Sequence, residues 1–267
     1  MSKIELDKYY TSPELAKYCV NKTEEIIGKE NITEYLEPSA GSGVFLNYLQ
    51  GNYKAYDIEP EDIRITKQDF LTLDLEYKKG RCVIGNPPYG EKNLLSTFFF
   101  RKSIEISDYI AFILPISQLN NNQQMYEFDL IYSENLGKRY YSDREVHCCF
   151  NIYKRPINGE LNTKPNRYKL NDITLKEIRK SRNQYLPPDF KYDIGMCSWG
   201  YVGRVVEYEG QYNQELYIKI NNDTLKERVL SVIKSANWCE LYPMTTTPRL
   251  KQWKVLKYIK EQIPEIS

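Results

Sequence analysis

The sequence has few of the residues and segments that metal sites, secretory signals and membrane spans require. It contains a single histidine, and its six cysteines are scattered without any Cys-x-x-Cys pair. No metal site is therefore expected, and the cysteines are interpreted as buried free thiols. No apolar run approaches the roughly eighteen residues of a membrane span, and residues 1–7 lack the apolar core of a secretory signal. We expect a cytoplasmic protein with no membrane contact.

An excess of charge of one sign is also lacking, because the net charge of the 267 residues is only +1. The distribution is uneven. Residues 1–155 carry 19 Lys/Arg against 23 Asp/Glu, whereas residues 156–267 carry 18 against 13. We interpret this as an acidic first domain followed by a basic region that faces a polyanion, although ordinary variation of surface charge is an alternative explanation. The predicted domain boundary falls after residue 155.

Short β-rich runs alternate with helical patterns in the first domain, which is typical of a parallel sheet covered by helices. A helix is expected to begin at Pro13, and another after a glycine-bearing loop, with Val44, Phe45, Tyr48 and Leu49 on its apolar face. The remaining expected elements are strands at 32–36, 53–56, 65–68, 81–85, 109–114 and 148–153, a helix at 94–106, a small sheet at 199–220, and helices at 224–238 and 248–263. The prediction is an α/β protein with a Rossmann-like sheet and a smaller α+β region after it.

The tetrapeptide Asn86-Pro87-Pro88-Tyr89 directly follows the strand at 81–85. An amino group conjugated to an aromatic ring is a poor nucleophile, because its lone pair is delocalised. Hydrogen bonds to the Asn86 side-chain carbonyl and the Pro87 backbone carbonyl would localise that lone pair, and Tyr89 would stack on the ring. The prolines would hold the loop rigid. The alternative is a simple turn that ends a strand, since Asn-Pro often opens turns.

A glycine-bearing loop, residues 37–43, lies at an expected strand-to-helix turn, where α/β sheets bind nucleotide-like ligands. Its leading acid, Glu37, would repel a pyrophosphate but suits a cationic amino group, such as that of the methionine part of S-adenosylmethionine. Asp57 ends the next strand, where an acid can hydrogen-bond ribose hydroxyls; a solvated loop acid is the alternative. Asp69 could then accept the adenine amino group of the cofactor, and Phe70 could cover its ring.

In this order the motifs resemble those of nucleic-acid amino-methyltransferases, most closely the adenine-N6 DNA methyltransferases of restriction–modification systems and phages. The resemblance covers roughly the first 155 residues and implies a methyltransferase sheet with S-adenosylmethionine as cofactor. One departure is the span from Pro60 to Ile65, which is too short for the usual helix between the second and third strands. The residues to which the resemblance gives roles are Tyr10, Thr11, Glu37, Ser39, Gly41, Asp57, Asp69, Phe70 and Phe99 for the cofactor, Asn86, Pro87, Pro88 and Tyr89 for catalysis, and Tyr89 with Phe150 (or its rival Tyr153) for stacking on the target base.

The mechanism implied by the resemblance is base flipping, followed by direct attack of N6 on the methyl group without a metal or a covalent intermediate. The implied partner is DNA, bound by residues 156–267 as a target-recognition region of a monomeric protein, with a separately encoded restriction endonuclease as a further partner. The candidate DNA contacts are Arg179, Lys180, Arg182, Arg204, Arg249 and Lys251. The aromatic residues of this region, Trp199, Tyr201, Tyr208, Trp238 and Trp253, are expected in the core rather than on bases.

Other functions stay open at this point. The same tetrapeptide suits methylation of RNA adenine or guanine, or of a protein glutamine, because a planar amide nitrogen poses the same lone-pair problem. A degenerate methyltransferase that serves only as a binding scaffold would show eroded motifs, and neither motif is eroded. A fused nuclease is not favoured, because no separate acid-x-Lys follows Pro188-Asp189.

Overall fold

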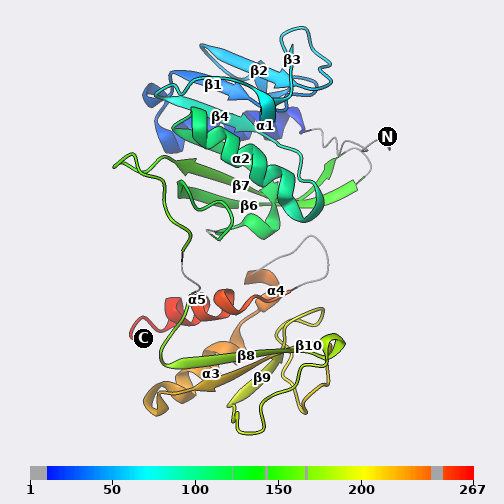
Figure 1. Ribbon diagram of the computed structural model, residues 1–267, viewed down its shortest axis with the longest axis vertical. Helices are drawn as coiled ribbons and strands as arrows, with labels where there is room; N and C mark the ends of the chain where they lie inside the picture. Colours follow the sequence, from blue (N-terminus) through cyan, green and yellow to red (C-terminus); the bar gives the residue numbers. More distant parts are fainter. Residues whose placement is uncertain (1–10, 122, 142–143, 166–167, 242–248) are drawn as a thin grey trace. The chain divides into compact units, whose positions relative to one another are not determined.

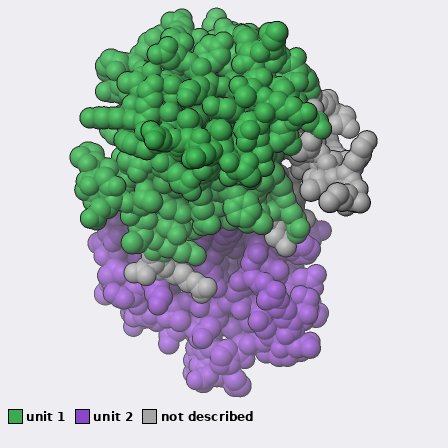
Figure 2. Space-filling view, turned by 45° about the horizontal axis from the view of Figure 1, so that its top comes forward, with its two compact units in different colours: residues 1–165 green, residues 166–267 purple. Residues whose placement is uncertain are grey.

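The computed structural model describes residues 11–121, 123–141, 144–165, 168–241 and 249–267. The chain divides into two compact units, residues 1–165 and 166–267, drawn as a ribbon in Figure 1 and in two colours in Figure 2. Among the described residues, no helix is both long and apolar enough to cross a membrane.

The first unit is built on a seven-stranded sheet. Its strands are β1 (Glu34–Glu37), β2 (Tyr53–Asp57), β3 (Thr66–Lys67), β4 (Arg81–Gly85), β5 (Tyr109–Pro115), β6 (Asp129–Tyr141) and β7 (Arg144–Lys154). They lie in the order β3-β2-β1-β4-β5-β7-β6; the first five are parallel, and β7 runs antiparallel to both of its neighbours. The order reverses between β1 and β4, which is the switch point where doubly wound sheets bind ligands beyond the carboxyl ends of the strands. The predicted Rossmann-like α/β sheet is confirmed.

Two helices, α1 (Pro13–Ile27) and α2 (Leu94–Ile106), cover opposite faces of this sheet (Figure 1). Side chains alternate along a strand, so Cys82 and Ile84 of β4 pack in the α1 core while Val83 packs in the α2 core. The α1 helix begins at Pro13, as predicted, because the Ser12 hydroxyl caps it by accepting a hydrogen bond from the Leu15 amide at 3.3 Å.

The helix predicted after the glycine-bearing loop is wrong. Only a 3-10 turn, η2 (Phe45–Asn47), forms there. Phe45 is buried in the core, as an apolar helix face would be, but β2 already starts at Tyr53 after Gly51, whose φ is 91°. The connection from β2 to β3 contains turns and no helix, in agreement with the short span noted in the sequence. The segments that connect β1 to β2 and β2 to β3 therefore consist of loops and turns without an α-helix.

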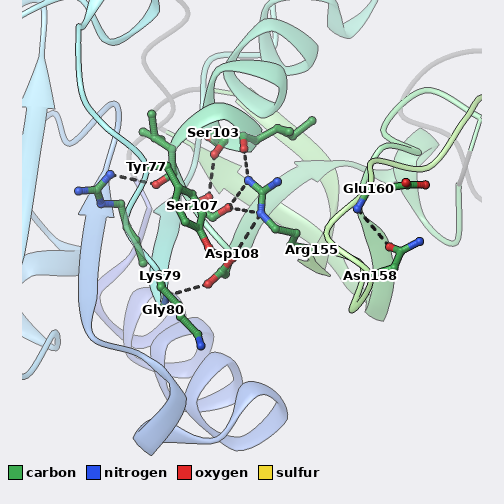
Figure 3. A network of polar contacts seen from close by, with 12 residues as sticks. Tyr77, Lys79, Gly80, Ser103, Ser107, Asp108, Arg155, Asn158 and Glu160 are labelled. Carbon is green, nitrogen blue, oxygen red and sulfur yellow. Dashed lines mark hydrogen bonds and ion pairs between the residues drawn. The ribbon is translucent and has the colours of Figure 1, made fainter.

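The division into units falls after residue 165 rather than after residue 155. Figure 3 shows why the segment after β7 stays with the first unit. The Arg155 guanidinium lies 3.3 Å from the carboxylate of Asp108, donates to the Ser107 carbonyl at 2.9 Å, and lies 5.1 Å from the centre of the Tyr77 ring. Farther on, the Asn162 amide donates to the Glu127 carbonyl at 2.9 Å. These contacts hold the connector against the first unit.

The second unit contains a three-stranded antiparallel sheet in the order β8-β10-β9. Its elements are β8 (Ile173–Arg179), β9 (Ile194–Cys197), β10 (Gln214–Ile220), α3 (Lys226–Ser235), α4 (Trp238–Leu241) and α5 (Gln252–Gln262). Leu216 and Ile218 of β10 pack with Val229 of α3 and Ile259 of α5, so the unit has its own core. The two predicted helices are present, with α3 and α5 shorter than expected, but only β10 of the sheet lies within the predicted range 199–220, because β8 and β9 precede it.

A buried ion pair connects the amino ends of β1 and β4. Arg81 donates to Glu34 at 2.7 Å and to the carbonyl oxygens of Glu76 and Ile106 at 2.7 and 2.9 Å, and Lys78 donates to the other Glu34 oxygen at 2.9 Å. Burial would raise the pKa of Glu34, but the hydrogen bonds from Lys78 and Arg81 lower it below its usual value. The network therefore stabilises the edge of the sheet opposite the carboxyl ends.

Replacing Arg81 with Met should lower the free energy of unfolding by about 3–5 kcal/mol, because Glu34 would stay buried without its main partner. Urea denaturation followed by circular dichroism measures this loss. The matched control is Lys78→Met, which removes a half-exposed partner of the same carboxylate and should cost about 1 kcal/mol or less. In the wild type, the stabilisation should disappear as the pH falls through the lowered pKa of Glu34. Equal losses in the two variants would contradict the dominant role of Arg81.

Candidate active site

Loops that follow three neighbouring parallel strands meet at the carboxyl ends of the sheet. The Gly41 amide donates to the Asp57 carboxylate at 2.8 Å, which joins the loops after β1 and β2. The Ser39 hydroxyl lies 3.4 Å from the backbone carbonyl oxygen of Asn86, and the Asn86 amide nitrogen lies 3.3 Å from the Thr11 hydroxyl. Thr11, Asn86 and Ser39 thus form one series of contacts, and Gly41 and Asp57 form a second one that shares the loop after β1.

The Asp57 carboxylate is fixed by two backbone amides. One oxygen accepts from Gly41 and the other from Glu59, both at 2.8 Å. Gly41 has a φ of 51°, and no atom of the described residues lies within 4 Å of a Cβ built on it, so these residues leave the loop open on that side. Each carboxylate oxygen can accept a second hydrogen bond, which leaves Asp57 able to bind hydroxyl groups of a ligand beside the open loop.

Glu37 is a buried carboxylate at the end of β1. It is 2% exposed, and among the described residues its Oε2 atom has no hydrogen-bond partner. Its Cγ atom lies 3.4 Å from a Cβ built on Gly85, which places it beside the end of β4. Burial first, and the Asp57 charge second, raise the pKa of Glu37 well above its usual value, while Arg64 acts in the opposite direction. A ligand with a cationic amino group would supply the partner that this carboxylate lacks.

The predicted adenine-binding residues lie together on the α2 side of the sheet. The rings of Phe70 and Phe99 are 5.4 Å apart between centroids and tilted by 30°. Asp69 is exposed and caps the 3-10 turn η3 (Phe70–Thr72) by accepting from the Leu71 amide at 2.9 Å. Phe99, which the sequence motif placed only loosely, therefore reaches the same spot as Phe70 from a different element.

The tetrapeptide directly follows β4, and its last residue turns into the core. Tyr89 is buried, and its hydroxyl lies 3.4 Å from the Cys148 sulfur of β7. Its carbonyl accepts from the Leu95 amide at 3.2 Å, and a Cβ on Gly90 would lie only 2.8 Å from the Leu95 Cβ atom. The chain is thus packed tightly against the start of α2. Stacking of Tyr89 on a target base stays a prediction.

Phe150, which was predicted to stack on the target base, lies in the core. Phe150 is fully buried within β7, where its backbone pairs with Ile113 and Glu134, and the rival Tyr153 is also fully buried. Neither ring has a free face for a base in this structure, because β7 is a central strand covered on both sides. The expectation for Phe150 is therefore corrected to a core role. Tyr10 lies outside the described residues.

Asp62 and Arg64 lie beside the glycine-bearing loop of the candidate site, and the sequence analysis missed both of them. Arg64 donates to Asp62 at 2.6 Å and to the Asn47 side chain at 3.0 Å, and both charged groups lie within 3.4 Å of a Cβ built on Gly43. The hydrogen bonds from Arg64 lower the pKa of Asp62 to about 2. The pair supports the glycine-bearing loop, after which the predicted helix does not form. The only sequence signal was the short span between Pro60 and Ile65.

The loop that carries the tetrapeptide is also held at its other end, before α2, by contacts of Asn93 that the sequence analysis did not predict. Asn93, in the left-handed region with a φ of 62°, donates from its side chain to the Ser117 hydroxyl at 2.8 Å. Its carbonyl accepts from the hydroxyls of Ser96 and Thr97, each at 3.0 Å. The loop between Asn86 and α2 is therefore held at both of its ends.

The predicted DNA contacts belong to different segments of the second unit. Arg179 ends β8, Lys180 and Arg182 form the 3-10 turn η6 (Lys180–Arg182), Arg204 follows β9, and Arg249 and Lys251 precede α5. Arg179 and Arg249 lie 3.4 and 3.9 Å from the Glu177 carboxylate, so part of their charge is compensated. Burial, and then the charge of Arg249, lower the pKa of Lys251. Arg179 and Arg249 lie near each other because they share the Glu177 carboxylate, and Lys251 is close enough to Arg249 to be affected by its charge.

The predictions for the cysteines of the chain and for the aromatic residues of the second unit are confirmed for some residues and wrong for others. All six cysteines are free, and five are buried while Cys239 is exposed. Trp238 lies in the core, but Trp199, Tyr201 and Tyr208 are exposed, so the expectation of core positions is wrong for these three. Across the part of the chain that the structure describes, no group of three or more His, Cys, Asp or Glu side chains could hold a metal ion.

Comparison with known proteins gives partial matches. No protein-family model matches the chain. The type II methyltransferases M.HincII and M.HindII, both from Haemophilus influenzae, are each 32% identical to it over 96 residues. The matches cover 33% of this chain but only 18% and 17% of the two relatives, so the chain spans less than a fifth of their length.

Among solved structures, a Pyrococcus horikoshii protein proposed to be an RNA methyltransferase is 15% identical, with a TM-score of 0.45, over 58% of this chain and 89% of that one. The 23S rRNA methyltransferase ErmE is also 15% identical, with a TM-score of 0.42, over 56% of this chain and 70% of that one.

Proposed function

We propose that this chain is an S-adenosylmethionine-dependent methyltransferase that acts on N6 of adenine in DNA. The observation that carries the proposal is the series of contacts from Thr11 through Asn86 to Ser39, at the switch point of the sheet. It joins a loop suited to the cofactor with a tetrapeptide suited to activating an amino group. The similarity to two type II methyltransferases supports the same class of activity.

The residues present fit the proposed cofactor. The Glu37 carboxylate, whose Oε2 atom has no partner among the described residues, suits the methionine amino group, and the fixed Asp57 carboxylate suits the ribose hydroxyls. The exposed Asp69 suits the adenine amino group, and the neighbouring rings of Phe70 and Phe99 would pack against adenine if one face of these buried side chains were uncovered. When bound, S-adenosylmethionine supplies a methyl group activated by its sulfonium charge.

Asn86 and Pro87 would prepare the target amino group. The Asn86 amide nitrogen faces Thr11, so its carbonyl oxygen points away from Thr11 and can be directed at a target amino group. Together with the Pro87 carbonyl it would accept the two N6 hydrogens and localise the nitrogen lone pair. Asn86 is too weak a base to remove a proton beforehand, so the proton would leave to solvent after transfer.

DNA is the substrate that we favour, with the second unit as target-recognition region. Residues 166–267 carry 17 Lys/Arg against 12 Asp/Glu, which suits contact with a polyanion. The tetrapeptide alone does not separate adenine in DNA from adenine in RNA or from a protein glutamine. The first experiment must therefore read the product on DNA directly.

Expression in a host that lacks adenine methylation, followed by sequencing that detects modified bases, should reveal methyladenine at one short motif. Asn86→Ala should lower the modified fraction at least about 100-fold, because one of the two activating acceptors is lost. Asn21→Ala, at an exposed position of α1, is the control and should leave methylation unchanged. Unmodified DNA from a folded chain that binds S-adenosylmethionine would contradict the assignment to DNA and direct the assays to RNA and protein glutamine.

Glu37→Gln should weaken S-adenosylmethionine binding roughly tenfold or more, because the amide cannot pair with the cationic amino group. Titration calorimetry measures this affinity. Below the raised pKa of Glu37, wild-type affinity should increase with pH, since binding needs the ionised carboxylate, and the variant should lack this dependence.

The same variant should be more stable than the wild type at pH 7. Because the pKa of Glu37 is higher in the folded than in the unfolded chain, the wild type loses stability as the pH rises from the usual glutamate pKa toward the raised value. Glutamine carries no such penalty. A variant that is destabilised and still binds the cofactor normally would rule out a ligand-binding role for Glu37.

A further inference from the structure

A turn of the second unit, residues 199–205, presents large apolar side chains to solvent; we call it the aromatic turn. Trp199 is 40% exposed, Tyr201 61% and Val205 50%. Three such residues within one short turn form a patch that single scattered exposures would not produce. Contiguous exposed apolar surface marks interaction sites.

The backbone of the aromatic turn is fixed. The Gly203 amide donates to the Cys197 carbonyl at 2.9 Å, and the Cys197 amide donates to the Arg204 carbonyl at 2.7 Å. Gly203 has a φ of 85°, and a Cβ built on it would lie 2.3 Å from the ring of Trp238, so the turn packs directly on a buried side chain. Groups presented by a fixed backbone lose less entropy when they bind a partner.

A buried carboxylate anchors the chain that returns from the turn. Glu215 of β10 has no exposed surface and accepts hydrogen bonds from the amides of Gly210 and Tyr212 at 2.8 and 2.7 Å and from the Tyr217 hydroxyl at 2.6 Å. The Tyr212 ring in turn lies 6.3 Å from the Tyr201 ring. The exposed tyrosine is therefore supported by a well-anchored segment.

Arg204 supplies charge within the same surface. Its guanidinium lies 4.6 Å from the centre of the Tyr201 ring, and the residue is exposed. An arginine stacked on an aromatic ring keeps its planar donors in place for phosphate or a base edge.

Buried polar atoms without partners lie at the base of the turn. Among the described residues, Ser198 Oγ, Gln214 Oε1 and Arg249 Nε make no hydrogen bond, and Ser198 is fully buried. The Ser198 amide donates to the Gln214 carbonyl at 3.0 Å, and the Ser198 carbonyl accepts from the Leu250 amide at 2.8 Å, so these segments are adjacent. Folded proteins seldom leave such atoms unsatisfied except where they serve another purpose.

We propose that the aromatic turn is a contact surface for duplex DNA, in which Trp199 and Tyr201 supply aromatic faces and Arg204 a charged contact. The basic balance of residues 166–267 favours a polyanion over an acidic or neutral partner. The proposal rests on the proposed DNA methylation and assigns target binding to particular residues of the second unit.

The test measures binding of the full chain to a labelled duplex that contains the methylated motif, or to a random-sequence duplex if no motif is methylated. Tyr201→Ala and Arg204→Ala should each weaken binding roughly tenfold or more. Tyr201→Phe, which keeps the ring, should bind like the wild type. Arg228→Ala is the matched control, because it removes the same charge from an exposed position on α3.

Cofactor binding and the unfolding temperature are measured for every variant, so loss of folding is recognised separately. Wild-type affinity in both Tyr201→Ala and Arg204→Ala would overturn the proposal, as would an equal loss in Arg228→Ala, which would indicate only a general charge effect. A wild-type chain that neither binds nor methylates DNA would overturn both this proposal and the proposed function. DNA methylation that is insensitive to the turn would overturn this proposal alone.

Discussion

The hydrogen bond from the Gly41 amide to the Asp57 carboxylate fixes the geometry on which the candidate site depends. Glu37 and Ala55 are register partners in parallel strands, so the loops after β1 and β2 leave the sheet side by side. The same carboxylate accepts from the Glu59 amide, and one side chain therefore sets the course of both loops. The position of Ser39, and its contact with Asn86, follow from that arrangement.

Strand β1 contains two buried glutamates whose surroundings shift their pKa values in opposite directions. At the amino end, Glu34 is bound by Arg81 and Lys78, and these partners lower its pKa. At the carboxyl end, one oxygen of Glu37 has no partner among the residues that the structure describes, and burial raises the pKa of this carboxyl. The first arrangement stabilises the folded sheet, whereas the second costs stability and suits a site that is completed by a ligand.

The sequence was most informative where the rules of parallel sheets apply. Buried apolar runs identified β4 and β5, and motifs at strand ends had to meet because parallel strands share one carboxyl edge. The thirteen-residue strand β6 was not predicted, because its composition is polar; in the described part of the sheet it pairs with β7. The burial of Phe150 and the anchoring of Arg155 depend on contacts far along the chain, which local patterns do not contain.

The described strands of the second unit form a sheet of their own, and the unit packs around its own core. It follows a connector that the first unit holds in place. Such a construction lets evolution exchange or diversify one unit as a module while the chemistry of the other stays intact. Substitutions at Tyr201, Arg204 or Val205 would change exposed side chains, so the second unit has a surface that can vary without a new fold.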